Sequence, residues 1–205
     1  MRCLPLISCL VVLLGCTSAY KGLEPVTGNI NNIQKFKPVF TTALYRTQVN
    51  VAGKYLSGLL VIKKMPDSSV RILFSNEMGL KFFDFGFLNN GNFEVYYVIK
   101  QMNKKAVIKT LRKDFELILM RSLQGSNAFI RKDNQFIYYV FPQSKGFYTY
   151  ITNSPGDKLV RMERSSKRKP VVEVISKDYI HGVPDSIAVS HKNFDFTIGL
   201  KRIER

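Results

Sequence analysis

The chain of 205 residues contains no tryptophan and two histidines, and its three cysteines all lie within the first sixteen positions. Because no cysteine follows Cys16, the rest of the chain can form neither a disulfide framework nor a cysteine-based metal site. The GxSxG, HExxH and glycine-rich phosphate-binding motifs of common enzyme classes are also missing. We therefore expect a binding protein, not an enzyme, with no metal and no cofactor. A hydrolase whose site is assembled from distant positions stays open as a weaker alternative.

The few side chains suited to catalysis form no obvious constellation. His181 and His191 lie beside turn residues, where we expect them at the surface. Asp84 and Glu94 fall within predicted strands and could be paired, but a lone carboxylate on a strand more often faces solvent. These four residues therefore give no support to a catalytic function.

Residues 1–15 are typical of a lipoprotein signal peptide. Arg2 supplies a short positive region, and the apolar segment 4–14 that follows is too short to span a bilayer. The segment ends in Leu-Leu-Gly-Cys at 13–16, which resembles the lipobox of bacterial lipoprotein precursors. We therefore predict that Cys16 is lipidated. The alternative is an ordinary signal peptide that happens to contain a cysteine.

Residues 16–37 are predicted to be the lipidated cysteine and a flexible tether. They contain glycine, proline and an Asn-rich run at 29–32, without a sustained hydrophobic period. No later stretch is long and apolar enough for a transmembrane helix, so we expect the protein to be lipid-anchored to a membrane. Thr17 and Ser18 carry no acidic retention signal, which favours the periplasmic face of the outer membrane.

Acidic side chains are scarce. The chain has 31 Lys and Arg against 15 Asp and Glu, a net charge of +16, and the loss of Arg2 with the signal peptide leaves +15. Such a balance commonly indicates nucleic acid, but an exported lipoprotein seldom meets it, so we expect no nucleic-acid partner. Anionic lipid head groups, acidic glycans or an acidic protein surface remain as partners, and simple solubility remains as the competing explanation.

The segment 70–87 predicts a β-hairpin around which the fold is organised. Alternation places Val70, Ile72 and Phe74 on one face of its first strand, and three phenylalanines share one face of its second strand. Asn76 and Gly79 suit the first and fourth positions of a type I turn. Glu77 and Met78 then occupy its centre, where Met78 either projects into solvent or folds back over its own sheet. Both interpretations stay open at this point.

The rest of the chain alternates between predicted strands and turn signals. One helix is expected at 103–123, capped by Asn103 and closed by Gly125, with an apolar stripe at helical spacing. It either lies on a sheet or roofs a cavity. Around a dozen short strands in meander order predict a large curved antiparallel sheet or open barrel. Besides the central hairpin, these strands are expected at 40–51, 56–65 (with Gly58 at a bulge), 93–99, 128–132, 136–141, 147–152, 159–164, 171–177, 186–190 and 194–203.

Three segments resemble the LolB family of outer-membrane lipoproteins, whose members receive other lipoproteins from the soluble carrier LolA. Residues 71–79 (RILFSNEMG) resemble the family's strand ending in Asn-Pro-Leu-Gly, with Glu77 in place of the proline. Residues 183–189 (VPDSIAV) resemble its Pro-led penultimate strand, and residues 194–203 resemble its closing strand. The resemblance runs over nearly all of the mature chain, although the loop after the helix is short and the tryptophans are absent.

This resemblance implies a mainly β fold with some α, namely an incomplete, half-open antiparallel β-barrel of eleven strands over residues 38–205, covered by one or more helices. Its apolar cavity would hold acyl chains, and the turn Glu77-Met78-Gly79 would be a membrane-insertion loop. The candidate residues for the cavity are Phe74, Phe83, Phe85, Phe87, Leu111, Phe115 and Ile118.

The resemblance also implies a function. The protein would be a monomeric, non-enzymatic acceptor that takes acylated lipoproteins from a LolA-like periplasmic carrier and inserts them among the phospholipids of the outer membrane. The alternative is an anchored lipid- or glycan-binding module, or a structural subunit of an envelope complex.

Overall fold

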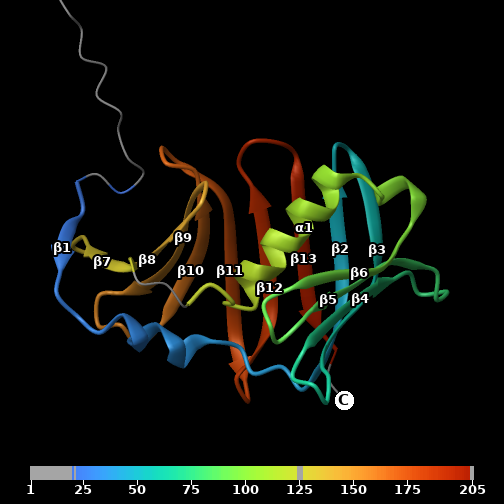
Figure 1. Cartoon of the computed structure of the whole chain (residues 1–205), viewed down its shortest axis with the longest axis horizontal. Coiled ribbons are helices and arrows are strands. Elements are labelled where there is room, and N and C mark those ends of the chain that lie inside the picture. Colours follow the sequence, from blue (N-terminus) through green and yellow to red (C-terminus); the bar gives the residue numbers. More distant parts are fainter. Residues whose placement is uncertain (1–19, 21, 124–126, 204–205) are drawn as a thin grey trace, which may run out of the picture.

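The structure is a computed structural model, and it describes Tyr20 and residues 22–123 and 127–203. The strands form one antiparallel sheet in the order β1-β7-β8-β9-β10-β11-β12-β13-β2-β3-β4-β5-β6 (Figure 1). Their bounds are β1 (Glu24–Val26), β2 (Thr42–Val51), β3 (Lys54–Lys64), β4 (Val70–Ser75), β5 (Lys81–Phe87), β6 (Phe93–Val98), β7 (Phe129–Lys132), β8 (Phe136–Gln143), β9 (Gly146–Asn153), β10 (Leu159–Ser165), β11 (Pro170–Ile180), β12 (Val183–His191) and β13 (Phe196–Arg202).

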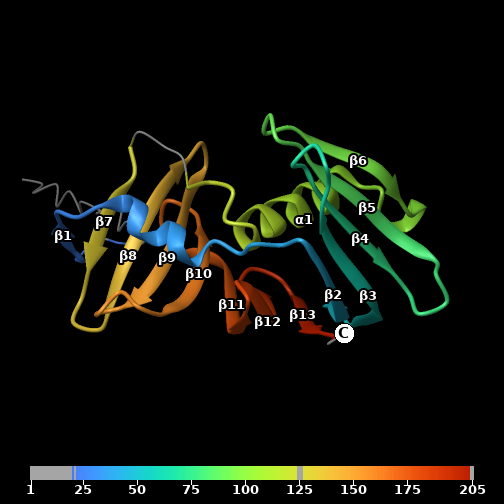
Figure 2. The same ribbon diagram turned by 90° about the horizontal axis from the view of Figure 1, so that it is seen from below.

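The sheet is a meander whose last strand closes onto its first long one. Strands β7 to β13 follow one another, and β13 then pairs with β2 through contacts such as Ile198 with Val49. The sheet curves into an open trough (Figure 2). The predicted half-open antiparallel barrel is therefore confirmed. Among the described residues, twelve strands lie within 38–205, where eleven were implied, and β1 adds a thirteenth before that range.

One helix, α1 (Lys105–Ile118), lies in the trough, between the wall made by β4–β6 and the strands β10 and β11 (Figure 2). It is shorter than the expected 103–123. The N-cap is Lys104, which makes no side-chain hydrogen bond there. The expected cap, Asn103, instead follows the short 3-10 helix η2 (Lys100–Met102) as its C-cap. At the other end Met120 takes a left-handed conformation (φ +48°), which stops the helix before the predicted Gly125, a residue outside the described part.

The apolar core lies between α1 and the concave face of the sheet. Along β8, Tyr139 and Phe141 belong to this core, whereas Tyr138 and Val140 belong to a second, smaller cluster. Because side chains alternate across a strand, the smaller cluster lies on the opposite face of the sheet. The side chain of Tyr20 is buried there, and its hydroxyl donates to Glu163 Oε2 over 3.1 Å.

The flexible tether expected up to residue 37 is shorter in the structure. β1 pairs with β7, and the 3-10 helix η1 (Ile30–Phe36) buries Ile33 completely in the main core. The composition of this segment suggested a linker, but one buried isoleucine and three paired residues tie it to the sheet. With Tyr20 also held, three residues separate the folded part from Cys16, which itself lies outside the described residues.

Gly58 was expected at a bulge, and the structure gives another reason for its presence. It pairs regularly with Thr47, without a shift of register. A Cβ atom on Gly58 would lie 2.0 Å from the carbonyl oxygen of Ser75. The glycine therefore permits the close approach of β4 to β3 just before the Asn76–Gly79 turn.

Candidate functional site

The β4–β5 turn has the geometry that its sequence predicts. Gly79 N donates to Asn76 O over 3.1 Å, Leu80 N donates to Asn76 Oδ1 over 2.8 Å, and Gly79 adopts a φ of +85°. Met78 is 93% exposed, so of the two open interpretations the one in which it folds back over its sheet is wrong. The turn projects at the end of the molecule opposite to β1 (Figures 1 and 2).

The predicted lining residues of the cavity lie together, but they are packed against one another. All seven candidates are at most 4% exposed and belong to the main core. Phe83 stacks on Phe85 with 4.5 Å between ring centroids, and it also contacts Phe74 at 5.6 Å and Phe115 on α1 at 5.9 Å. In this structure the trough beneath α1 is therefore filled with side chains where an open cavity was expected.

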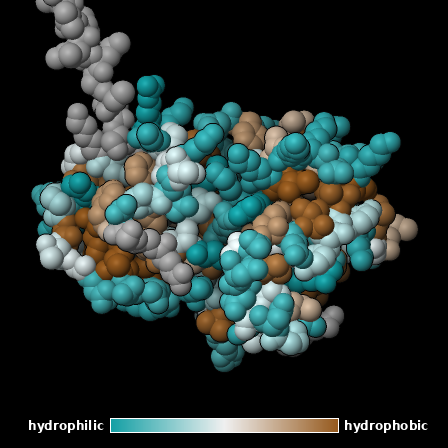
Figure 3. Space-filling view, in the orientation of Figure 1, coloured by the Kyte–Doolittle hydropathy of each residue, from teal (hydrophilic) through white to brown (hydrophobic). Residues whose placement is uncertain are grey.

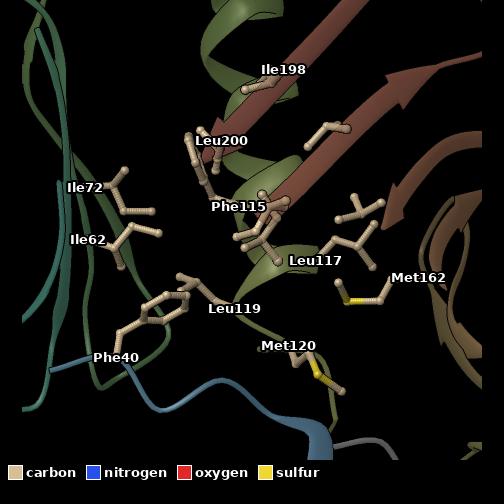
Figure 4. Close-up of a cluster of buried hydrophobic side chains, with 14 of the residues drawn as sticks. Phe40, Ile62, Ile72, Phe115, Leu117, Leu119, Met120, Met162, Ile198 and Leu200 are labelled. Atoms are coloured by element: carbon tan, nitrogen blue, oxygen red, sulfur yellow. The ribbon is translucent and has the colours of Figure 1, made fainter. Parts of the chain in front are cut away.

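An open cleft lies at the C-terminal end of α1. Its volume is about 960 Å³, which falls within the range typical of ligand pockets. Phe40, Leu119, Met120 and Leu123 line it and are also members of the main core, so the cleft reaches the apolar interior. Figure 4 shows Phe40, Leu119 and Met120 at one end of that core.

Several separate segments contribute to the cleft. They are the chain after η1, the β3–β4 connection, the β5–β6 turn, the end of α1 and the β8–β9 hairpin. None of the seven predicted cavity residues lines it. Sequence reasoning missed this cleft because only the tertiary fold brings those segments together. The further residues that line it are Gln34, Lys37, Pro38, Val39, Lys64, Ser68, Val70, Asn89, Asn90, Gly91, Arg112, Glu116, Arg121, Ser122, Gln143 and Tyr148.

The electrostatics of the cleft centre on Glu116. Its Oε1 accepts from Arg112 Nε over 2.7 Å, and its Oε2 accepts from the Tyr148 hydroxyl over 3.1 Å. Burial raises the pKa of Tyr148 far above its ordinary value, and the Glu116 charge raises it further. Arg121 donates from its guanidinium to Phe87 O over 3.3 Å and to Leu88 O over 2.6 Å. Burial lowers the pKa of Arg121.

A buried ionic cluster holds α1 against the sheet. Asp114 on α1 is fully buried, with its Oδ2 2.8 Å from His191 Nε2 on β12 and its Oδ1 3.3 Å from Arg164 Nη2 on β10. The expectation that His191 lies at the surface was therefore wrong, because β12 extends through it and its side chain points into the trough. A signal for Asp114 was present in the sequence, since it lies three residues after Leu111 and four before Ile118 on the apolar stripe.

Asp84 was expected to face solvent, and that expectation was also wrong. Its carboxylate is buried and accepts two hydrogen bonds from Arg71, over 2.7 and 2.8 Å. The Arg71 guanidinium also lies 4.2 Å from the ring centroid of Tyr96. This bidentate pair joins β4 to β5 on the face opposite the core, so Asp84 stabilises the hairpin.

On the face that carries α1, apolar surface shows in two separate areas among hydrophilic side chains, one over β7–β9 and one beside α1 (Figure 3). Within the described residues, no helix has the length and apolar character needed to cross a membrane. The same residues bring no group of three or more His, Cys, Asp or Glu side chains together as a set of metal ligands.

Comparison with known proteins gives a fold and no close relative. No family model matches the chain, and no curated protein matches it. Among solved structures, a LolA superfamily protein from Nitrosomonas europaea is 8% identical, with 87% of this chain and 93% of that chain covered at a TM-score of 0.50. The chain has a LolA-like fold. This likeness does not single out LolB within that superfamily.

Two further solved structures match this chain over a similar share of its length. A putative outer membrane lipoprotein-sorting protein domain from Vibrio parahaemolyticus is 7% identical, with 85% of this chain and 90% of that chain covered. A DUF1329 family protein from Desulfovibrio piger is 9% identical, with 88% and 92% covered. Their TM-scores are both 0.46.

Proposed function

We propose that this protein is a non-enzymatic carrier that binds acyl chains in the cleft at the end of α1 and delivers them to a membrane. The observation that carries the proposal is the continuity of the cleft with the apolar core through Phe40, Leu119, Met120 and Leu123. An acyl chain must be kept from water during transfer, and such a floor offers it an equivalent apolar surface. The LolA-like fold supports this proposal.

Within this proposal, Cys16 is lipidated and anchors the protein to the periplasmic face of the outer membrane. The cargo is an acylated lipoprotein received from a LolA-like carrier. The exposed Met78 is the part that touches the bilayer: its burial among acyl chains is worth roughly 1.5–3 kcal/mol, enough for a brief contact. The second candidate, an anchored lipid-binding module, is favoured by the cationic side chains around the cleft.

The short connection to Cys16 constrains how the domain meets the membrane. Four residue steps from Cys16 to Tyr20 span at most about 14 Å. Tyr20 lies near β8 and β9, at the opposite end of the molecule from the Met78 turn (Figure 1). The anchor and Met78 can therefore reach one bilayer together only when the long axis of the domain lies along its surface.

The experiment that tests the proposal is uptake of a photoreactive acyl lipid by the full chain in neutral detergent micelles, read out as cross-linked protein. Depletion in cells then separates the two candidates. Mislocalised lipoproteins would support the acceptor, whereas normal lipoprotein sorting with cross-linking intact would support the lipid-binding module. Absence of cross-linking at every lipid concentration at which the protein stays folded would contradict acyl binding.

A further inference from the structure

The cleft at the end of α1 combines an apolar floor with a charged rim. Its floor consists of side chains from the core, among them Leu119 and Met120. Its rim carries polar groups from the β5–β6 turn and from the chain after η1. A purely apolar ligand would leave the polar rim groups without hydrogen-bond partners. A purely polar ligand would leave the apolar floor exposed to water. The occupant that fits both parts is an amphiphile.

The charges around the cleft are unbalanced. Lys37, Lys64, Arg112 and Arg121 line it against one carboxylate, Glu116, which leaves three positive charges in excess. Opposite charge at a partly desolvated rim favours the anionic form of a ligand. We propose that the cleft selects acyl lipids with an anionic headgroup over neutral acyl lipids. This inference rests on the acyl binding of the proposed function, and it specifies the ligand of the second candidate, the lipid-binding module.

The contacts of Arg121 support this assignment. Arg121 donates to the carbonyl oxygens of Phe87 and Leu88, which are uncharged acceptors, and burial lowers the pKa of its guanidinium. The nearby charge of Arg112 lowers that pKa further, and Glu116 offsets part of the effect. A headgroup anion beside Arg121 would supply the compensation that one carboxylate does not.

Glu116 makes the inference testable in both directions. Its carboxylate accepts hydrogen bonds from Arg112 and from the Tyr148 hydroxyl. Glu116 therefore neutralises part of the positive charge that would otherwise attract an anionic ligand. If the ligand is an anion, removal of this negative charge strengthens binding. If Glu116 merely supports the structure, its removal weakens binding of every ligand alike.

The experiment uses the full chain in neutral detergent micelles with two photoreactive lipids that share the same acyl chains, phosphatidylglycerol and phosphatidylcholine. We expect phosphatidylglycerol to cross-link at a lower lipid concentration than phosphatidylcholine.

The double variant Lys37→Gln/Lys64→Gln, which changes two exposed rim lysines, should weaken phosphatidylglycerol binding by about 3- to 10-fold and leave phosphatidylcholine binding unchanged. Glu116→Gln should strengthen phosphatidylglycerol binding by about 3-fold or more. The matched control is Lys167→Gln/Lys169→Gln, an equal charge change in an exposed loop outside the cleft.

Each other outcome overturns the inference, and the outcomes can be told apart. Equal cross-linking of both lipids would contradict the headgroup preference and leave acyl binding intact. A preference lost equally in the control variant would mean that total charge, and not the cleft, attracts the lipid. Weaker binding of both lipids by Glu116→Gln, at unchanged thermal stability, would assign Glu116 a structural role only. Cross-linking of neither lipid would remove the proposed function together with the inference.

Discussion

Beneath α1 and beyond its C-terminal end, the same apolar trough is filled to different degrees. Under the helix, Phe83, Phe85 and Phe115 pack ring against ring and leave less than 4% of any of these side chains exposed. Where the helix ends, Leu119 and Met120 border an open cleft of about 960 Å³. One part of the core is thus closed by its own side chains, and the other part is open to a ligand. If the proposed function holds, acyl binding needs no displacement of α1 in order to begin.

The largest effect is expected where the trough is closed. Phe85→Ala removes a fully buried ring that stacks on Phe83, so the free energy of unfolding should fall by about 3–5 kcal/mol. Chemical denaturation measures this loss, with Tyr55→Ala, a change at an exposed position, as the control. Acyl cross-linking should persist at temperatures where the variant is folded. A loss below about 1 kcal/mol would mean that the rings beneath α1 are loosely packed, and the trough would then be open at both places.

The second prediction concerns what holds α1 over the closed part. Asp114→Asn keeps the shape of the side chain but removes the charge that faces Arg164 and His191. Breaking a buried ionic cluster in this way should cost about 3 kcal/mol, with faster amide hydrogen exchange along α1. Unchanged exchange in α1 would show that apolar packing alone holds the helix, and Asp114 would then have no part in closing the trough.

The third prediction tests the open part. Val39 is exposed and lines the cleft, so Val39→Trp should narrow it at a stability change within about ±0.5 kcal/mol. Acyl cross-linking should drop by about tenfold or more, the equivalent of about 1.4 kcal/mol. Tyr55→Trp, which adds the same ring at an exposed position outside the cleft, serves as the control. Full cross-linking by the Val39 variant would place the acyl chain elsewhere.

The smallest effect on stability is expected at the far tip of the molecule. Met78 makes no buried contact, so Met78→Glu should change the free energy of unfolding by no more than about ±0.5 kcal/mol. Lipid uptake by the cleft should also be unchanged. Delivery into liposomes should fail for Met78→Glu and proceed for Met78→Leu, because only the apolar side chain can enter the bilayer. Normal delivery by Met78→Glu would remove the membrane contact from the account.

The sequence predicted the elements whose signals are local. Alternation in 70–87 and the Asn-x-x-Gly turn determined the hairpin and its buried face. They did not determine the register, because a shift between Phe74 and Ser75 pairs Ile72 with Phe85. The apolar stripe of α1 was equally readable, since Leu111, Phe115 and Ile118 repeat at helical spacing and are buried. Each of these patterns depends only on residues within one helix or one pair of adjacent strands.

Features built from distant residues were not predictable in the same way. His191 lies 77 positions from Asp114, so nothing near it in the chain shows that its imidazole is buried beside a carboxylate. The segment of β1 and η1 has the composition of a linker, and only contact with β7 and the core orders it. The cleft likewise requires residues from 34 to 148 to meet, and no single stretch carries its pattern.

The most direct test of acyl binding at the open end of the trough is to map where a lipid's acyl chain lies in the full-length protein. A lipid with a photoreactive group at the end of its acyl chain can be cross-linked in micelles, and the modified residues identified by mass spectrometry. We expect cross-links on Phe40, Leu119, Met120 and Leu123, with no change in hydrogen exchange of α1. Cross-links on Phe83 or Phe85, accompanied by faster exchange in α1, would contradict the claim that the ligand enters at the open end of the trough.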